Sequence, residues 1–224
     1  MAQRLLNLYA TYVYTDDFWH LSPEERKSFR EHLASDAEEA GEVTHFYSTF
    51  PTRTDCDFLI WSAWGADETD SGANAFQTYA RKVERWRQFV KPVHTFWGYT
   101  NPSMYSRGKS EQDMDPFEGK RATYLTVYPF SKTKEWYVKS MDARQGMMNE
   151  HIKLGKQYFD IKQLLIYSFG LQDHEFVVSY EMEDLPRFSE LVKQLRSTEA
   201  RLFTLLDTPL ITAFYLDKES YING

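Results

Sequence analysis

The sequence predicts an α+β protein built from two ferredoxin-like repeats, each with the element order βαββαβ. Two observations predict this fold: short blocks of sequence recur at a constant offset, and the same order of strands and helices follows in both halves. The chain has 224 residues, of which 42% are hydrophobic and 26% are charged, so extensive disorder is excluded. Two repeats of about a hundred residues each account for this length.

Three blocks of the N-terminal half recur in the C-terminal half. Residues 19–26 are similar to 136–144, residues 31–32 to 150–151, and residues 55–60 to 173–178. The offsets stay between 117 and 119 residues, and an internal duplication explains this regularity better than chance does.

Residues 1–100 contain one full repeat. Ser22 is expected to cap the first helix, with Pro23 at its first position, Glu25 completing a capping box and Gly41 ending it. The other expected elements are strands at 5–14, 43–50, 58–64 and 92–99, and a second helix with Phe76, Ala80, Val83 and Val90 on one apolar face.

Residues 121–224 repeat this plan. The expected elements are strands at 122–130, 161–169, 175–182 and 210–216, a helix from Ser140 to about Tyr158, and a helix capped by Asp184. Residues 101–120 are rich in Asn, Pro, Ser, Gly, Lys and Asp, which is typical of a linker, and loops of this length are usually mobile or functional.

Composition excludes several classes of protein. The formal net charge of −7 disfavours nucleic acid as a partner. Cys56 is the single cysteine, so an internal disulfide and a multi-cysteine metal site are excluded. No signal peptide and no apolar run of membrane-spanning length is found, so we expect a soluble, cytoplasmic protein. The aromatic content of 17% is typical of wide aromatic packing, of a flat ligand or of a large subunit interface, and the last of these would give a homo-oligomer.

His151 is the histidine whose position is most informative. Met147, His151, Leu154 and Tyr158 share one face of the predicted helix, so the imidazole points inward. One interpretation is a core histidine satisfied by a hydrogen bond; the other is an axial ligand to a flat iron cofactor. His32 matches it in the first half but lies on a strongly charged helix, so a second metal site is not predicted.

Three further residues are candidates, and the first two allow two interpretations each. Tyr128 is either a packed strand tyrosine or a redox-active phenol. Lys132 either solvates a turn or neutralises an acidic substrate, and Gln163 on a later strand is a neutral polar group that can face a ligand.

In combination these residues resemble a known family. The similarity rests on Tyr128-Pro129-Phe130-Ser131-Lys132, Glu135-Trp136-Tyr137, Glu150-His151, Gly155, Tyr158, the stretch 168–176 and the stretch 195–201. Together they resemble the chlorite dismutase family, and within it the coproheme decarboxylases. The resemblance covers nearly the whole chain and implies a duplicated, dimeric α/β-barrel-type fold and a homopentamer.

The resemblance also implies roles for individual residues. It implies His151 as the proximal iron ligand, Tyr128 as the radical-forming tyrosine and Lys132 as a neighbour of the reactive propionate. Trp136 matches a tryptophan of the haem pocket. Tyr105 matches a tyrosine that contacts a propionate. Arg201 stands where the Firmicute-type decarboxylases have serine, and an arginine there can form a charge-assisted pair with a propionate. The family also has a propionate-binding arginine, and three residues of this chain are candidates for its position: Lys120, Arg121 and Arg107.

The distal position distinguishes activities within the family, because chlorite dismutases carry an arginine there. Counting back from Gly170 places Gln163 at this position, and counting forward from His151 places Leu164. Neither residue is an arginine, so chlorite dismutation is disfavoured.

The resemblance therefore implies an oxidoreductase that uses H2O2 to decarboxylate iron coproporphyrin III to haem b in haem biosynthesis. Its partners are then a porphyrin and hydrogen peroxide. The alternatives are a haem-dependent peroxidase or chlorite-active relative, and a haem-binding protein that is not an enzyme.

Overall fold

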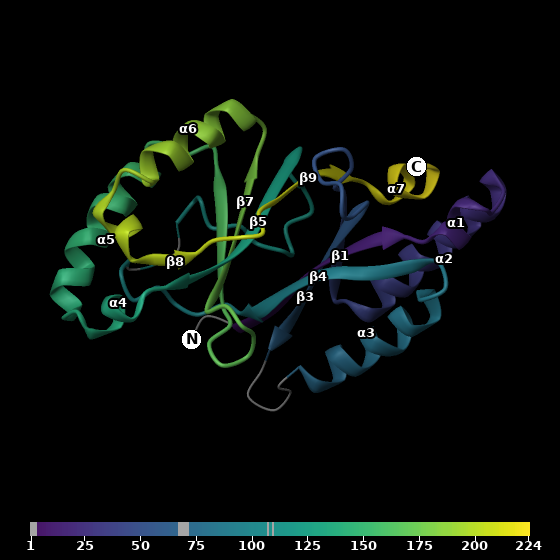
Figure 1. Ribbon diagram of the computed structural model, residues 1–224, viewed down its shortest axis with the longest axis horizontal. Helices are drawn as coiled ribbons and strands as arrows, with labels where there is room; N and C mark the ends of the chain where they lie inside the picture. Colours follow the sequence, from purple (N-terminus) through teal and green to yellow (C-terminus); the bar gives the residue numbers. More distant parts are fainter. Residues whose placement is uncertain (1–3, 67–71, 107, 109) are drawn as a thin grey trace. The chain divides into compact units, whose positions relative to one another are not determined.

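The computed structural model describes residues 4–66, 72–106, 108 and 110–224. Arg107 therefore lies outside the described residues. The chain divides into two compact units, residues 1–100 with 211–224 and residues 101–210 (Figure 1). Each unit combines an antiparallel sheet with helices, so the predicted α+β class is confirmed.

The first unit contains the expected βαββαβ order. Its elements are β1 (Arg4–Tyr14), α1 (Asp16–Trp19), α2 (Pro23–Ala40), β2 (Val43–Ser48), β3 (Phe58–Ala66), α3 (Ala73–Trp86), β4 (Val90–Tyr99), β9 (Ile211–Leu216) and α7 (Lys218–Asn223). The strands pair antiparallel in the order β4-β1-β3-β2-β9. Ser22 and Glu25 form the predicted capping box of α2, and Gly41 is its C-cap. Val90 starts β4 instead of extending α3, because α3 ends at Trp86.

The second unit carries every candidate site residue. Its elements are β5 (Tyr124–Lys132), α4 (Lys134–Val138), α5 (Met141–Gly155), β6 (Lys162–Tyr167), β7 (Phe176–Met182), α6 (Leu185–Leu195), a 3-10 helix η1 (Glu199–Phe203) and β8 (Thr204–Leu206). The pairings give the strand order β6-β7-β5-β8. Asp184 caps α6 as predicted, and Ser140, the predicted start of the earlier helix, is the N-cap of α5. The helix α5 ends at Gly155, before Tyr158.

One face of the second sheet is covered by α5 and α6 (Figure 1). Tyr180 and Val178 of β7 pack there against Phe188 and Leu191 of α6 and against Leu154 of α5. This packing places α5 over the sheet and turns its inner side toward β5, β6 and β7.

Two segments differ from the sequence expectation. The closing strand, expected at 210–216 in the C-terminal half, pairs as β9 with β2 of the first unit. Tyr221 of α7 stacks on Phe46 of β2 with ring centroids 4.6 Å apart, and this contact holds the C-terminal segment against the first core. The segment expected as a linker is partly packed, since Met114 is only 2% exposed.

Among the residues that the structure describes, no helix is both long enough and apolar enough to cross a bilayer.

Candidate functional site

Tyr128 and Gln163 lie on the same face of the second sheet. Tyr128 pairs with Val178, and Gln163 pairs with Tyr180. Val178 and Tyr180 are two residues apart on β7, so their side chains and those of their cross-strand partners point to one side. This is the side that α5 and α6 cover. Leu164 pairs with Ser179 and points to the opposite side.

The Tyr128 phenol lies in a buried and aromatic environment. Its ring is nearly parallel to that of Tyr180, with centroids 6.2 Å apart. Burial raises the pKa of Tyr128, and hydrogen bonding with the Tyr180 hydroxyl partly offsets this rise. The phenol is therefore protonated at neutral pH.

His151 lies on α5, on the inner side of the helix. Met147, one turn earlier, is 6% exposed, and Leu154 packs with the residues of the sheet face. Burial lowers the pKa of His151 to about 4, and the nearby charge of Lys132 acts in the same direction. The imidazole is thus neutral at physiological pH, and this is the form that binds a metal.

One ring nitrogen of His151 is buried without a partner. Its Nδ1 atom has no hydrogen-bond partner among the described residues. A buried polar atom without a partner is costly, commonly by about 1–3 kcal/mol, and such atoms often mark a ligand site. The interpretation of His151 as a core histidine satisfied by a hydrogen bond receives no support at this nitrogen.

Lys132 ends β5 beside the indole of Trp136. Its Nζ atom lies 4.7 Å from the Trp136 ring centroid and donates a hydrogen bond of 3.2 Å to the carbonyl of Ala200. Burial lowers the pKa of Lys132 to about 8, and the positive charge of Arg201 adds to this effect. Such a lysine gains most from an incoming carboxylate, because the carboxylate would stabilise a charge that burial now disfavours.

Glu175 holds this lysine in place and was not singled out from the sequence. Its Oε2 atom accepts the backbone N–H of Lys132 at 2.8 Å and also accepts the hydroxyl of Tyr137. The Glu175 backbone N–H donates to the Ser131 side chain at 3.3 Å. The start of β7 therefore fixes the end of β5 and the adjacent helix α4.

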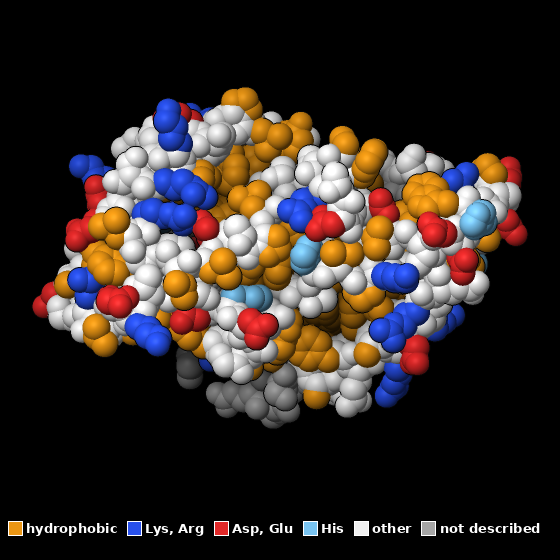
Figure 2. All heavy atoms as spheres, in the orientation of Figure 1, with side chains coloured by type: hydrophobic (Ala, Val, Ile, Leu, Met, Phe, Trp, Pro, Cys, Tyr) orange, Lys and Arg blue, Asp and Glu red, His pale blue; other side chains and the backbone are white. Residues whose placement is uncertain are grey.

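A cluster of three charged side chains, Asp207, Arg196 and Arg201, lies next to Tyr128. Asp207 accepts hydrogen bonds from Arg201 at 2.5 Å and from Arg196 at 3.3 Å. Asp207 raises the pKa of Tyr128 and the two arginines lower it, so all three act on the phenol. Figure 2 shows basic side chains gathered over the part of the molecule that α5 and α6 form in Figure 1. Two arginines and one aspartate leave a net positive charge at this end of the site.

Tyr105 and Arg121 differ in where the structure places them. The Tyr105 ring packs edge-on against Trp136, with centroids 6.3 Å apart, so it joins the Lys132 side of the site. Arg121 is fully buried and lies 3.6 Å from the carboxylate of Glu181. Glu181 is the residue after Tyr180 on β7, and adjacent side chains of a strand point to opposite faces, so Glu181 points away from the Tyr128 face. The structure therefore does not bring Arg121 together with the other candidate residues.

His151 of α5, Lys132 of β5 and Arg201 of η1 fit a flat iron cofactor that carries carboxylates. His151 offers a neutral imidazole with a buried nitrogen that lacks a partner, and Lys132 and Arg201 offer positive charge nearby. Aromatic side chains from the sheet and from α4 supply apolar surface. Within the described ranges, no group of three or more His, Cys, Asp or Glu side chains is arranged to hold a metal ion.

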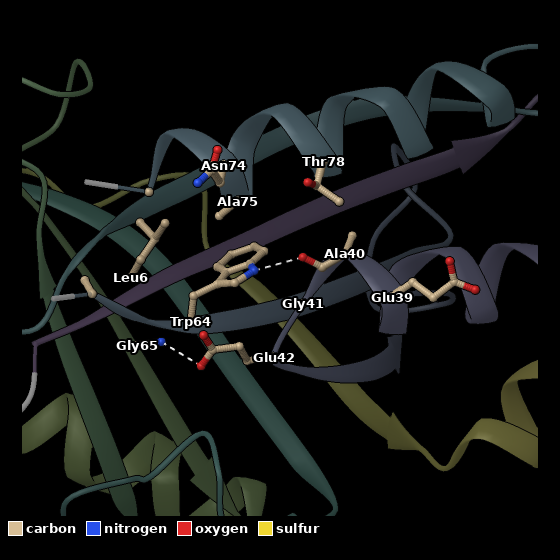
Figure 3. Close-up of a pocket in the computed structure, with 12 residues that line it drawn as sticks. Leu6, Glu39, Ala40, Gly41, Glu42, Trp64, Gly65, Asn74, Ala75 and Thr78 are labelled. Carbon is tan, nitrogen blue, oxygen red and sulfur yellow. Dashed lines mark hydrogen bonds between the residues drawn. The ribbon is translucent and has the colours of Figure 1, made fainter. Parts of the chain in front are cut away.

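A pocket of about 270 Å³ lies elsewhere, in the first unit, between α2, α3 and the strands β1 and β3 (Figure 3). Trp64 at its base donates to the carbonyl of Ala40 at 2.8 Å, and Glu42 accepts the backbone N–H of Gly65 at 3.0 Å. These two hydrogen bonds join the end of α2 and the residue pair that follows it to β3. None of the candidate residues lines this pocket.

Comparison with known proteins identifies the family. A sequence model of the family described as chlorite dismutase matches residues 17–216. A coproheme decarboxylase of Mycolicibacterium smegmatis is 27% identical over 180 residues, which covers 80% of this chain and 76% of that protein. The coproheme decarboxylase of Staphylococcus saprophyticus is 29% identical over 164 residues, which covers 66% of this chain and 64% of that protein.

A solved structure shares the fold. A variant of the chlorite dismutase from Candidatus Nitrospira defluvii, in complex with cyanide, has a TM-score of 0.84 at 19% identity, over 98% of this chain and 93% of that chain. The likeness agrees with the predicted fold of two ferredoxin-like repeats. Because the family model spans nearly the whole sequence, the chain belongs to the chlorite dismutase family.

Proposed function

We propose that this protein decarboxylates iron coproporphyrin III to haem b with hydrogen peroxide as the oxidant. The observation that carries the proposal is His151: a neutral imidazole with a buried, unpartnered nitrogen, on the helix that faces Tyr128 and Gln163. Two relatives named coproheme decarboxylase, at 27% and 29% identity, support the choice of substrate.

His151 would bind the iron of the porphyrin from the α5 side. When bound, the porphyrin iron supplies the oxidising chemistry, and the protein supplies position and charge. Gln163 would present a neutral amide on the sheet face. A neutral amide lacks the positive charge of an arginine, so it offers a chlorite anion little electrostatic hold. The reaction with chlorite is disfavoured for this reason.

Lys132 and Arg201 would hold carboxylates of the substrate. Arg201 lies close enough to both Tyr128 and Lys132 for its charge to lower the pKa of each. Lys132 and Arg201 can both donate charge-assisted hydrogen bonds to a propionate. Trp136 and Tyr105 would form an aromatic wall beside Lys132. Arg121 is assigned no contact with the substrate, because its ion pair with Glu181 lies on the other side of the sheet.

Tyr128 would carry the reactive radical. Its phenoxyl form would abstract a hydrogen atom from the propionate chain held beside it, and loss of CO2 would leave a vinyl group. For each propionate, one H2O2 and one proton are consumed, and one CO2 and two water molecules are released. The propionate is oxidised and the peroxide is reduced, so electrons balance.

The decisive experiment is anaerobic reconstitution with iron coproporphyrin III, followed by titration with H2O2 and mass spectrometry of the porphyrin. We expect the stepwise loss of two carboxyl groups, ending at haem b. A Tyr128→Phe variant should bind the porphyrin and fail to decarboxylate it. Turnover preserved in this variant would refute the radical role.

The other outcomes separate the alternatives. Binding with bleaching of the porphyrin and no decarboxylation would indicate a peroxidase, and release of O2 from chlorite would indicate a chlorite dismutase. Tight binding without turnover would indicate a haem-binding protein. We further propose a homopentamer that acts in the cytoplasm; light scattering of the purified protein would test the subunit number.

A further inference from the structure

A short strap, residues 110–114, lies against the second unit at the point where α5 ends and β6 begins. The strap is a closed turn: the Ser110 N–H donates to the Asp113 carboxylate at 2.8 Å, and the Asp113 N–H donates to the Ser110 carbonyl at 3.0 Å. Met114 anchors it, with 2% of its side chain exposed. The sequence alone indicated a linker here.

The side chain of Gln112 closes the end of α5. Its Nε2 atom lies 3.2 Å from the carbonyl oxygen of Gly155, 2.8 Å from that of Tyr158 and 3.2 Å from that of Ile161. The Gly155 carbonyl also accepts the backbone N–H of Tyr158, and the Tyr158 carbonyl accepts that of Ile161, each at 3.0 Å. Gln112 thus adds a second donor to these two carbonyls and ties the end of α5 to the turn that leads into β6.

The backbone of the same strap holds Gln163. The Gln163 N–H donates to the Gln112 carbonyl at 2.7 Å, and the Met114 N–H donates to the Gln163 carbonyl at 2.8 Å. Both backbone groups of Gln163 are therefore bonded to the strap, as in one step of a parallel β-ladder.

We propose that Gln112 is a positioning residue that couples the helix bearing His151 to the strand position bearing Gln163. The inference rests on the proposed function, in which these two residues lie on opposite sides of the porphyrin. His151 lies one turn before Gly155, so a displacement of the α5 terminus moves the imidazole. The backbone bonds at Gln163 keep the amide at a set distance from that terminus. Loss of the Gln112 side-chain donor leaves these backbone bonds in place and releases the α5 terminus from the strap, so the spacing between His151 and Gln163 would no longer be fixed.

The test compares two substitutions of similar length with opposite hydrogen-bonding capacity. Gln112→Met keeps the side-chain length and removes the donor, whereas Gln112→Lys supplies three N–H donors for the three carbonyls. Gln194→Glu is the matched control, because the amide of Gln194 bonds only to Glu190 on the exposed side of α6 among the contacts described.

Two readouts are needed. In the protein without porphyrin, Gln112→Met should speed amide hydrogen exchange of residues 156–163 about tenfold or more, since several hydrogen bonds are lost together. In the haem-loaded protein, the same variant should release haem to apomyoglobin about tenfold faster and show more than one axial-ligand species by electron paramagnetic resonance. Gln112→Lys and Gln194→Glu should match the wild type in both.

Several results would overturn the proposal. Unchanged exchange in Gln112→Met would show that the strap does not hold the α5–β6 junction. Faster exchange with unchanged haem release and a single unchanged axial-ligand signal would show that Gln112 stabilises the fold without positioning the site. If the wild type takes up no porphyrin, the proposed function fails, and the exchange result still decides whether Gln112 joins α5 to β6.

Discussion

Substitution of Lys132 by methionine should stabilise the protein without porphyrin while impairing its binding site. Methionine keeps the length of the side chain and its packing on Trp136, and it removes a charge that burial disfavours. Lys134, which is exposed at the start of α4, provides the matched control variant Lys134→Met.

The magnitude follows from the pKa of Lys132. A fall from the ordinary 10.5 to about 8 corresponds to about 3 kcal/mol of charging penalty in the folded state at pH 7. The substitution also removes the contact of the lysine cation with the Trp136 indole and the hydrogen bond to the Ala200 carbonyl. Losing these two interactions costs about 1 kcal/mol, which is subtracted from the gain. We therefore expect a net gain of about 2 kcal/mol, or roughly 4–8 °C in Tm for a chain of this size.

The sign of the pH dependence is determined by the same shift. The folded-state pKa lies below the unfolded-state value, so the penalty is complete below pH 8 and disappears as the pH rises to 10.5. The advantage of Lys132→Met should accordingly shrink by more than half between pH 7 and pH 9.5.

The assay is thermal unfolding of wild type, Lys132→Met and Lys134→Met without porphyrin, at both pH values, with and without added iron coproporphyrin III. The wild type should gain more Tm from the porphyrin than Lys132→Met does, because the carboxylates pair with the lysine. A lower Tm in Lys132→Met at pH 7, or a gain equal at both pH values, would refute the reasoning.

Three other predictions concern the same site. His151 has a folded-state pKa of about 4, below its ordinary 6.5, so the protein should lose up to about 3 kcal/mol of stability as the pH falls from 6.5 to 4. His151→Phe should remove that loss. If the urea midpoint falls equally with pH in the wild type and in His151→Phe, the prediction is wrong. Tyr180→Phe should raise the pKa of Tyr128, because the hydrogen bond that lowers it is lost; fluorine NMR of a fluorotyrosine placed at position 128 would show a higher titration midpoint, and an unchanged midpoint would count against the contact. Asp207→Asn should lower stability by roughly 0.5–1 kcal/mol, because Arg201 loses a partly exposed ion pair; an unchanged Tm would show that this pair contributes nothing measurable.

Helix ends that carry a cap signal were the most predictable features, because such signals are local; the C-terminal ends of α3 and α5 were placed too late. The capping box at Ser22 and Glu25, the Gly41 C-cap and the Asp184 N-cap each act within a few residues of the chain, and all three are present in the structure. The inward position of His151 also followed from helical periodicity. These features depend on φ/ψ preferences and spacing, which a sequence states directly.

Strand partners were less predictable, because pairing depends on residues distant in the chain. The apolar pattern of β9 identifies a strand but not the edge it joins, and its pairing with β2 depends on Tyr221 packing against Phe46. The same limit left the distal position open between Gln163 and Leu164. A shift of one residue turns a side chain to the other face of a sheet, and only the register with β7 places Gln163 on the side of Tyr128.

The residue types needed for the chemistry could therefore be identified from the sequence: an inward histidine, a strand tyrosine, a nearby lysine and no distal arginine. The tertiary structure decided which of them share a space. It placed Arg121 in an ion pair with Glu181 on the opposite side of the sheet, and it joined Glu175 to Lys132 and Gln112 to the end of α5. These contacts bring together residues separated by some 43 to 60 positions, and no local signal specifies them, because each depends on how strands and helices pack after they have formed.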